Sequence, residues 1–113
     1  MKALKIIFVI GIGIIFSCES NTYDEISGKN ENPTYNTSVK SIIDNNCLSC
    51  HGSSGGEFPT METYLQVKDA AQNGSMICRI DDQSCGSVMP QSGRMPQTKI
   101  NTIKKWTLNG CPN

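Results

Sequence analysis

Apolar residues recur at helical spacing in four segments of the chain, and no segment shows the clear alternation expected of a strand. In the first of these segments, Val39, Ile42 and Ile43 lie three and four positions apart and so share one helical face. The helices are expected over residues 38–47, 60–73, 75–81 and 98–109, with Thr37 or Ser38 and then Thr60 as the first two caps and Gly110 as the final stop. The pattern therefore predicts an all-α fold of about four short helices.

A separate apolar run lies at the N-terminus. Lys2 and Lys5 precede the uncharged residues 6–16, a run that is too short for a bilayer, which takes about 20 residues, but suits a signal peptide. Residues 15–18, with the sequence IFSC, resemble the bacterial lipobox, which implies cleavage before Cys18 and attachment of a lipid to its thiol. A plain secretory signal with an incidental cysteine is the alternative. Either interpretation exports the chain and permits disulfides.

A polar stretch separates this signal from the helical part of the chain. Residues 19–36 have few large apolar side chains and no helical or strand period, which is typical of a disordered linker. We therefore expect a signal peptide over 1–17, a lipid anchor and flexible linker over 18–36, and one domain over 37–113. The protein is expected in the bacterial cell envelope, held to a membrane through Cys18 and facing the periplasm.

Composition narrows the functions open to that domain. The chain has 113 residues, of which 37% are hydrophobic and 6% aromatic, so its apolar core is small. A domain with so small a core usually needs a disulfide, a metal or a cofactor for additional stability. Ten basic and ten acidic residues leave no net charge, which argues against a nucleic-acid partner held by a basic face. The length also excludes most enzymes that need a nucleotide-binding or large substrate domain.

The sequence Cys47-Leu48-Ser49-Cys50-His51 is the candidate for the chemistry of this domain. In an exported bacterial protein, C-x-x-C-H is the attachment pattern of c-type haem. Thiols three positions apart at the end of a helix can each bond one vinyl group of the same haem, and His51 can then donate an imidazole nitrogen to the iron. The alternatives are a thioredoxin-like redox pair, half of a zinc site and a structural disulfide. The lack of a βαβ pattern disfavours the first, and the single histidine disfavours the second.

A second iron ligand is expected from methionine, because the chain has no other histidine. Met61 and Met76 fall on apolar helix faces and are expected in the core. Met89 and Met95 both lie in the long loop over residues 83–97, each before a proline that restricts its backbone. The residues alone leave both of these open as the ligand.

Together these features resemble a small class I-type cytochrome c. The resemblance covers most of the domain: an Ile-rich helix into C-x-x-C-H, a middle helix, a Met-Pro loop, and a last helix with Ile100, Ile103 and Trp106. In that family a glycine-containing turn and an apolar residue separate the Met-Pro step from the last helix, which implies Met89 as the ligand and Met95 as the apolar residue. The resemblance also implies a helical bundle wrapped around one covalent haem c, with its first and last helices packed across each other.

Three further cysteines, Cys78, Cys85 and Cys111, are expected to form one disulfide and leave one buried thiol. We predict the pair Cys85–Cys111, which would tie the ligand loop to the last helix and stabilise the fold by about 3–4 kcal/mol. Cys78–Cys85 is the nearest alternative, because the two are close in sequence. Arg79 and Arg94 are candidate partners for a haem propionate, although no spacing favours either.

The sequence thus predicts a membrane-tethered electron carrier, and not an enzyme, that exchanges single electrons with a redox-protein donor and acceptor. The residues expected to hold its haem c are Cys47, Cys50, His51 and Met89. Two alternatives stay open. One is a five-coordinate haem protein that binds a gas or peroxide, and the other is a lipoprotein with a structural disulfide and no haem.

Overall fold

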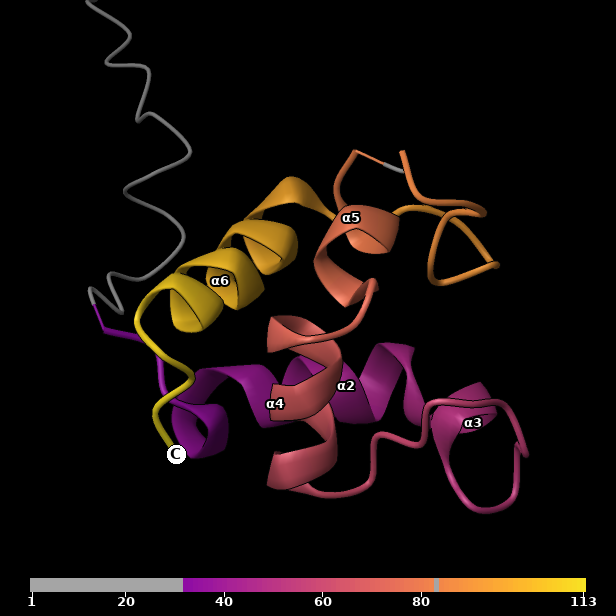
Figure 1. Cartoon of the computed structure of the whole chain (residues 1–113), viewed down its shortest axis with the longest axis horizontal. Helices are drawn as coiled ribbons and strands as arrows, with labels where there is room; N and C mark the ends of the chain where they lie inside the picture. Colours follow the sequence, from indigo (N-terminus) through magenta and orange to yellow (C-terminus); the bar gives the residue numbers. More distant parts are fainter. Residues whose placement is uncertain (1–31, 83) are drawn as a thin grey trace, which may run out of the picture.

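A computed structural model of the chain describes residues 32–82 and 84–113, and this part of the chain is helical without strands. Its elements are η1 (Tyr35–Val39), α2 (Lys40–Asn46), α3 (Leu48–His51), α4 (Tyr64–Gln72), α5 (Met76–Ile80) and α6 (Gln97–Leu108), shown in Figure 1. The all-α prediction is confirmed for these residues. None of the helices described here is both long and apolar enough to cross a membrane. The expected signal peptide, the lipidation site Cys18 and most of the expected linker lie outside the described residues.

The first helix begins earlier than the sequence predicts. η1 is a short π-helix that runs directly into α2, and its cap is Thr34 rather than Thr37 or Ser38. The Thr34 hydroxyl accepts a hydrogen bond from the N–H of Thr37 at 3.3 Å, and the Thr37 hydroxyl accepts one from the N–H of Thr34. The early start places the buried ring of Tyr35 6.1 Å from that of Trp106. The folded part therefore begins within the segment that we expected to be linker.

The core is built around one face of α6. Ile100, Ile103 and Trp106 lie on this face and are completely buried, as the helical spacing predicts. η1, α4 and α5 all contact α6, which lies above the N-terminal helices in the view of Figure 1. The other buried apolar residues are Tyr35, Val39, Ile42, Ile43, Met61, Val67, Ala70, Ala71, Met76, Ile80, Met95 and Cys111. Burial of each large aliphatic side chain of this kind contributes about 1.5–3 kcal/mol.

The C-terminal end of α6 is closed by a Schellman motif. Gly110 has φ +82°, and its N–H donates to the carbonyl of Thr107 at 3.0 Å. The N–H of Cys111 donates to the carbonyl of Trp106 at 2.9 Å, which completes the pair of bonds typical of this motif. The Cys111 carbonyl in turn accepts a hydrogen bond from the Tyr64 hydroxyl at 2.7 Å. Gly110 is therefore confirmed as the helix stop, and the turn that follows it is bonded to α4.

The two ends of the described chain lie side by side. The carbonyl of Pro112 accepts hydrogen bonds from the backbone N–H of Tyr35 and from Nε1–H of Trp106, both at 2.8 Å. Figure 1 shows the C-terminus beside η1, whereas α3 with its loop and the loop after α5 lie at the other end of the molecule. The loops that carry the candidate ligands are thus remote from both chain ends.

The second helix begins later than predicted, at Thr63 rather than Thr60. The Thr63 hydroxyl accepts a hydrogen bond from the N–H of Gln66 at 3.3 Å, and Oε1 of Gln66 accepts one from the N–H of Thr63 at 2.9 Å. In this helix Leu65 is 70% exposed, whereas Val67, Ala70 and Ala71 are buried. α5 and α6 match their predicted ranges to within one residue at each end.

Candidate functional site

The C-x-x-C-H segment forms one tight helical turn at the end of α2. Cys47 ends α2 and begins α3, and its carbonyl accepts hydrogen bonds from the N–H groups of Cys50 at 3.2 Å and His51 at 2.8 Å. Residues three and four positions apart share a helix face, so these three side chains lie on the same side of the turn. All three line one cavity. The structure therefore brings together the three residues that the sequence singled out.

The imidazole of His51 is oriented by a backbone carbonyl. Nδ1 of His51 lies 2.8 Å from the carbonyl oxygen of Pro59. A carbonyl can only accept a hydrogen bond, so the neutral ring carries its proton on Nδ1 and leaves the lone pair of Nε2 free. The role of Pro59 could not be predicted from the sequence, because a backbone carbonyl that accepts a hydrogen bond has no residue-type signature.

The loop that supplies this carbonyl is bonded back onto α3. The N–H of Glu57 donates to the carbonyl of Cys50 at 3.0 Å, and the N–H of Met61 donates to the carbonyl of His51 at 2.8 Å. At the start of the loop, the N–H of Ser53 donates to Oε1 of Glu62 at 2.8 Å. This hydrogen bond from Ser53 holds the pKa of the Glu62 carboxyl below its ordinary value. The conformation that presents Pro59 to His51 is thus fixed on both sides.

The cavity has a volume of about 660 Å³, within the range of 300–1,000 Å³ typical of ligand and cofactor pockets. α3 and the loop after it form one part of its wall, and the ends of α4 and α5 form another. The loop after α5 contributes residues 89–92 and Met95. These segments gather at the end of the molecule that lies away from the C-terminus in Figure 1.

All four candidate methionines line this cavity, but they differ in burial. Met61 and Met76 are each 7% exposed and Met95 is 4% exposed, and all three belong to the core cluster. Met89 is half-buried and packs against that cluster. The prediction that Met61 and Met76 are core residues is confirmed, and Met95 joins them. Met89 as the iron ligand stays a prediction.

The two thiols of the motif differ in exposure. Both Cys47 and Cys50 are free, Cys50 is exposed, and Cys47 is half-buried. Burial raises the pKa of the Cys47 thiol to about 11, so it is protonated at neutral pH. Among residues 32–82 and 84–113, no three histidine, cysteine or carboxylate side chains gather as a metal site.

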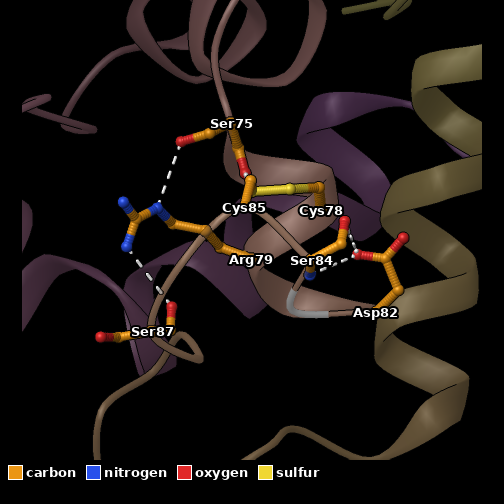
Figure 2. Close-up of a disulfide and its surroundings, with 7 residues drawn as sticks. All are labelled: Ser75, Cys78, Arg79, Asp82, Ser84, Cys85 and Ser87. Carbon is orange, nitrogen blue, oxygen red and sulfur yellow. Dashed lines mark hydrogen bonds between the residues drawn. A yellow bond between two sulfur atoms is a disulfide. The ribbon is translucent and has the colours of Figure 1, made fainter.

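The predicted disulfide Cys85–Cys111 is wrong. The structure pairs Cys85 with Cys78 of α5, at a Cα–Cα distance of 6.1 Å that suits a disulfide (Figure 2). Cys111 is held instead by its backbone bonds at the end of α6, where its thiol is free and buried. The expectation of one disulfide and one buried thiol among the three is confirmed.

The two arginines that were candidates for a haem carboxylate occupy different places. Arg79 lines the cavity. Nη2 of Arg94 donates to Gln97 at 2.7 Å and lies 3.4 Å from Oδ1 of Asp81, outside the cavity wall. No spacing in the sequence separates these two arginines, because the path of the loop between α5 and α6 decides which one reaches the cavity.

Comparisons with protein-family models, curated proteins and solved structures found no match to this chain. The function proposed below therefore depends on the residues of the site and on their arrangement.

Proposed function

We propose that the protein is a lipid-anchored monohaem c-type cytochrome that carries single electrons and is not an enzyme. The observation that carries the proposal is the hydrogen bond from Nδ1–H of His51 to the Pro59 carbonyl, at the edge of a cavity of cofactor size that two free cysteines also line. Metal-binding histidines almost always donate their other ring N–H in this way, which fixes the tautomer and the ring orientation.

The residues that line the cavity fit a covalently bound haem. The thiols of Cys47 and Cys50 would each add across one vinyl double bond, with the sulfur going to one carbon and the thiol hydrogen to the other. This addition needs no oxidant and has no leaving group. His51 would offer Nε2 to the iron, and Met89 would offer its thioether sulfur as a second ligand. When bound, the haem supplies one-electron exchange between ferric and ferrous iron.

The cellular setting of the proposal comes from the N-terminal sequence. A lipid on Cys18 would hold the domain to a membrane of the bacterial cell envelope, on the periplasmic side. Residues 19–31 would act as a linker that lets the domain move away from the membrane surface. A tethered carrier of this kind would exchange electrons with a redox-protein donor and acceptor in the same compartment.

Retention of haem by the denatured polypeptide tests the proposal directly. The protein would be produced with a c-type haem maturation system, denatured and acid-extracted, and its reduced-minus-oxidised spectrum recorded. We expect haem to stay with the wild-type chain and with a Ser49→Ala control in the same turn. The double variant Cys47→Ser/Cys50→Ser should release or lack it. A colourless wild-type protein, or one whose haem is extracted completely, contradicts the proposal.

A further inference from the structure

The segment between α5 and Met89 folds back onto α5. The disulfide Cys78–Cys85 joins α5 to a residue seven positions later in the chain. Oδ1 of Asp82 accepts hydrogen bonds from the N–H of Ser84 at 2.9 Å and from its hydroxyl at 2.8 Å. Figure 2 shows this turn directly beside the disulfide. A covalent bond therefore holds Cys85 to α5, and two hydrogen bonds hold Ser84 to Asp82.

The side chain of Arg79 supports the returning segment. Its Nε donates to the Ser75 hydroxyl at 3.3 Å, and its Nη1 donates to the carbonyl of Ser87 at 3.4 Å. In Figure 2 the guanidinium extends between these two serines. Gly86 passes so close that a Cβ there would lie 3.1 Å from Nη2, and its φ of +134° also favours glycine. Arg79 thus packs against the backbone of the segment as well as bonding to it.

A third contact reaches Met89 itself. The N–H of Met89 donates to the backbone carbonyl of Arg79 at 3.1 Å. The contacts therefore converge on two neighbouring residues of α5, Cys78 and Arg79, and α5 in turn packs against α6. These contacts hold the backbone of Met89 at the cavity wall, so moving that backbone away from the wall requires them to open or to strain.

We propose that the Met89 clamp, defined as Cys78, Cys85 and Arg79, positions Met89 for axial ligation. The inference rests on the proposed function, in which Met89 is a ligand. The alternative is that the disulfide only stabilises the fold. Positioning and simple stabilisation predict different results when an added iron ligand competes with Met89. The apparent affinity of the added ligand rises in proportion to the fraction of molecules in which Met89 is displaced, whereas the overall stability of the fold does not affect that affinity.

Imidazole titration of the ferric haem protein measures this fraction. We expect the variant Cys78→Ser/Cys85→Ser to bind imidazole about tenfold more tightly than wild type, because a covalently closed short loop is opened. Arg79→Gln should bind it roughly threefold more tightly, and Arg79→Lys should fall between that variant and wild type. The long-wavelength absorption of thioether-ligated ferric haem should weaken in the same order.

Two controls separate positioning from general stability. Thr63→Ala removes the cap of α4 and lowers stability without touching the clamp, so imidazole affinity should stay within about twofold of wild type. Cys111→Ala removes a cysteine outside the clamp and should behave in the same way.

Amide hydrogen exchange gives a second test of the inference. It compares the wild type before and after reduction of the disulfide, and it needs neither a variant nor the haem spectrum. Exchange at Met89 should become faster on reduction, while the amides in the middle of α6 stay unchanged.

Wild-type imidazole affinity in the double-serine variant overturns the inference, and so does unchanged exchange at Met89 after reduction. If the double variant does not fold, Arg79→Gln and the exchange measurement decide the question. Failure of the proposed function has a different signature. In that case the wild type holds no covalent haem, or Met89→Ala binds imidazole with wild-type affinity.

Discussion

At the residue scale, the two candidate ligands are held through backbone carbonyls. The carbonyl of Pro59 accepts the Nδ1 proton of His51, and the carbonyl of Arg79 accepts the N–H of Met89. Any residue type can supply such an acceptor, so neither partner leaves a signal in the sequence. The candidate ligands themselves come from the sequence, because only a few side chains bind iron and the spacing of C-x-x-C-H is restrictive.

Replacement of Met89 by alanine tests the axial assignment. Met/His ligation raises the haem potential, so we expect Met89→Ala to lower the potential, change the oxidised and reduced spectra and allow the reduced protein to bind carbon monoxide. These quantities follow from a redox titration and absorbance spectroscopy of the haem protein.

Met95→Ala is the matched control, because Met95 lines the same cavity but is buried in the core. It should keep wild-type ligation and instead lose about 2–5 kcal/mol of unfolding free energy in urea. The reverse result, with altered spectra for Met95→Ala and wild-type spectra for Met89→Ala, would reassign the ligand to Met95.

At the element scale, Asp81 joins three parts of the fold. It follows α5 directly, and its carboxylate binds Nζ of Lys104 in α6 at 2.5 Å and lies 3.4 Å from Nη2 of Arg94 in the connecting loop. The hydrogen bond from Lys104 is the main cause that lowers the pKa of Asp81. α5, which carries Cys78 and Arg79, is therefore attached to α6 by charge as well as by packing.

The ion pair between Asp81 and Lys104 should make the stability of the fold depend on pH in the acid range. Because the pKa of Asp81 is lower in the folded state than in the unfolded chain, its contribution is complete above about pH 4 and is lost as the pH falls through the folded value. Asp81→Asn should therefore lower Tm at pH 6, and the difference from wild type should shrink as the solution is acidified to pH 2. Asp44→Asn, in an exposed pair with Lys40, is the control for an ordinary surface contact. An equal Tm difference at pH 6 and pH 2 would show that the ionised carboxylate is not responsible.

The helices differ in how well local sequence predicts them. α5 and α6 follow their apolar spacing, and Gly110 stops α6, so the pattern alone gives their ends to within one residue. The start of α4 is displaced because the carbonyl of Pro59 and the N–H of Met61 bond to His51, which keeps both residues out of the helix. η1 starts early because Tyr35 packs on Trp106, a residue far away in sequence. Contacts between distant segments therefore set the boundaries that local patterns missed, and the disulfide partner of Cys85 depended on the fold in the same way.

In the whole molecule, the two ends of the described chain lie at one end, and α3 and the loop after α5 lie at the other (Figure 1). Residues of both segments line the cavity. The carbonyl of Pro112 joins the two ends by accepting hydrogen bonds from Tyr35 and Trp106. Its two donors are a backbone N–H and an indole N–H of residues in the buried core. The last residues of the chain are thus part of the fold.

Deletion of Pro112 and Asn113 should consequently destabilise the protein. Both donors would lose their acceptor, and each unsatisfied buried group costs about 1–3 kcal/mol, so the unfolding free energy in urea should fall by about 2–6 kcal/mol. Deletion of Asn113 alone keeps the Pro112 acceptor and removes only the exposed contact from Asn36 to Asn113, so it should cost less than about 0.5 kcal/mol. Equal effects of the two deletions would mean that the Pro112 bonds do not contribute.

The shared location of the two chain ends also determines where the protein can be labelled. A fluorophore or an affinity handle joined after Asn113 would lie beside η1, at the same end as the point where the chain enters at residue 32. It would leave the cavity mouth open to solvent. The exposed residues 53–58 follow α3, and two of them line the cavity. A label of the same size attached to these residues would keep a protein partner away from the opening of the cavity.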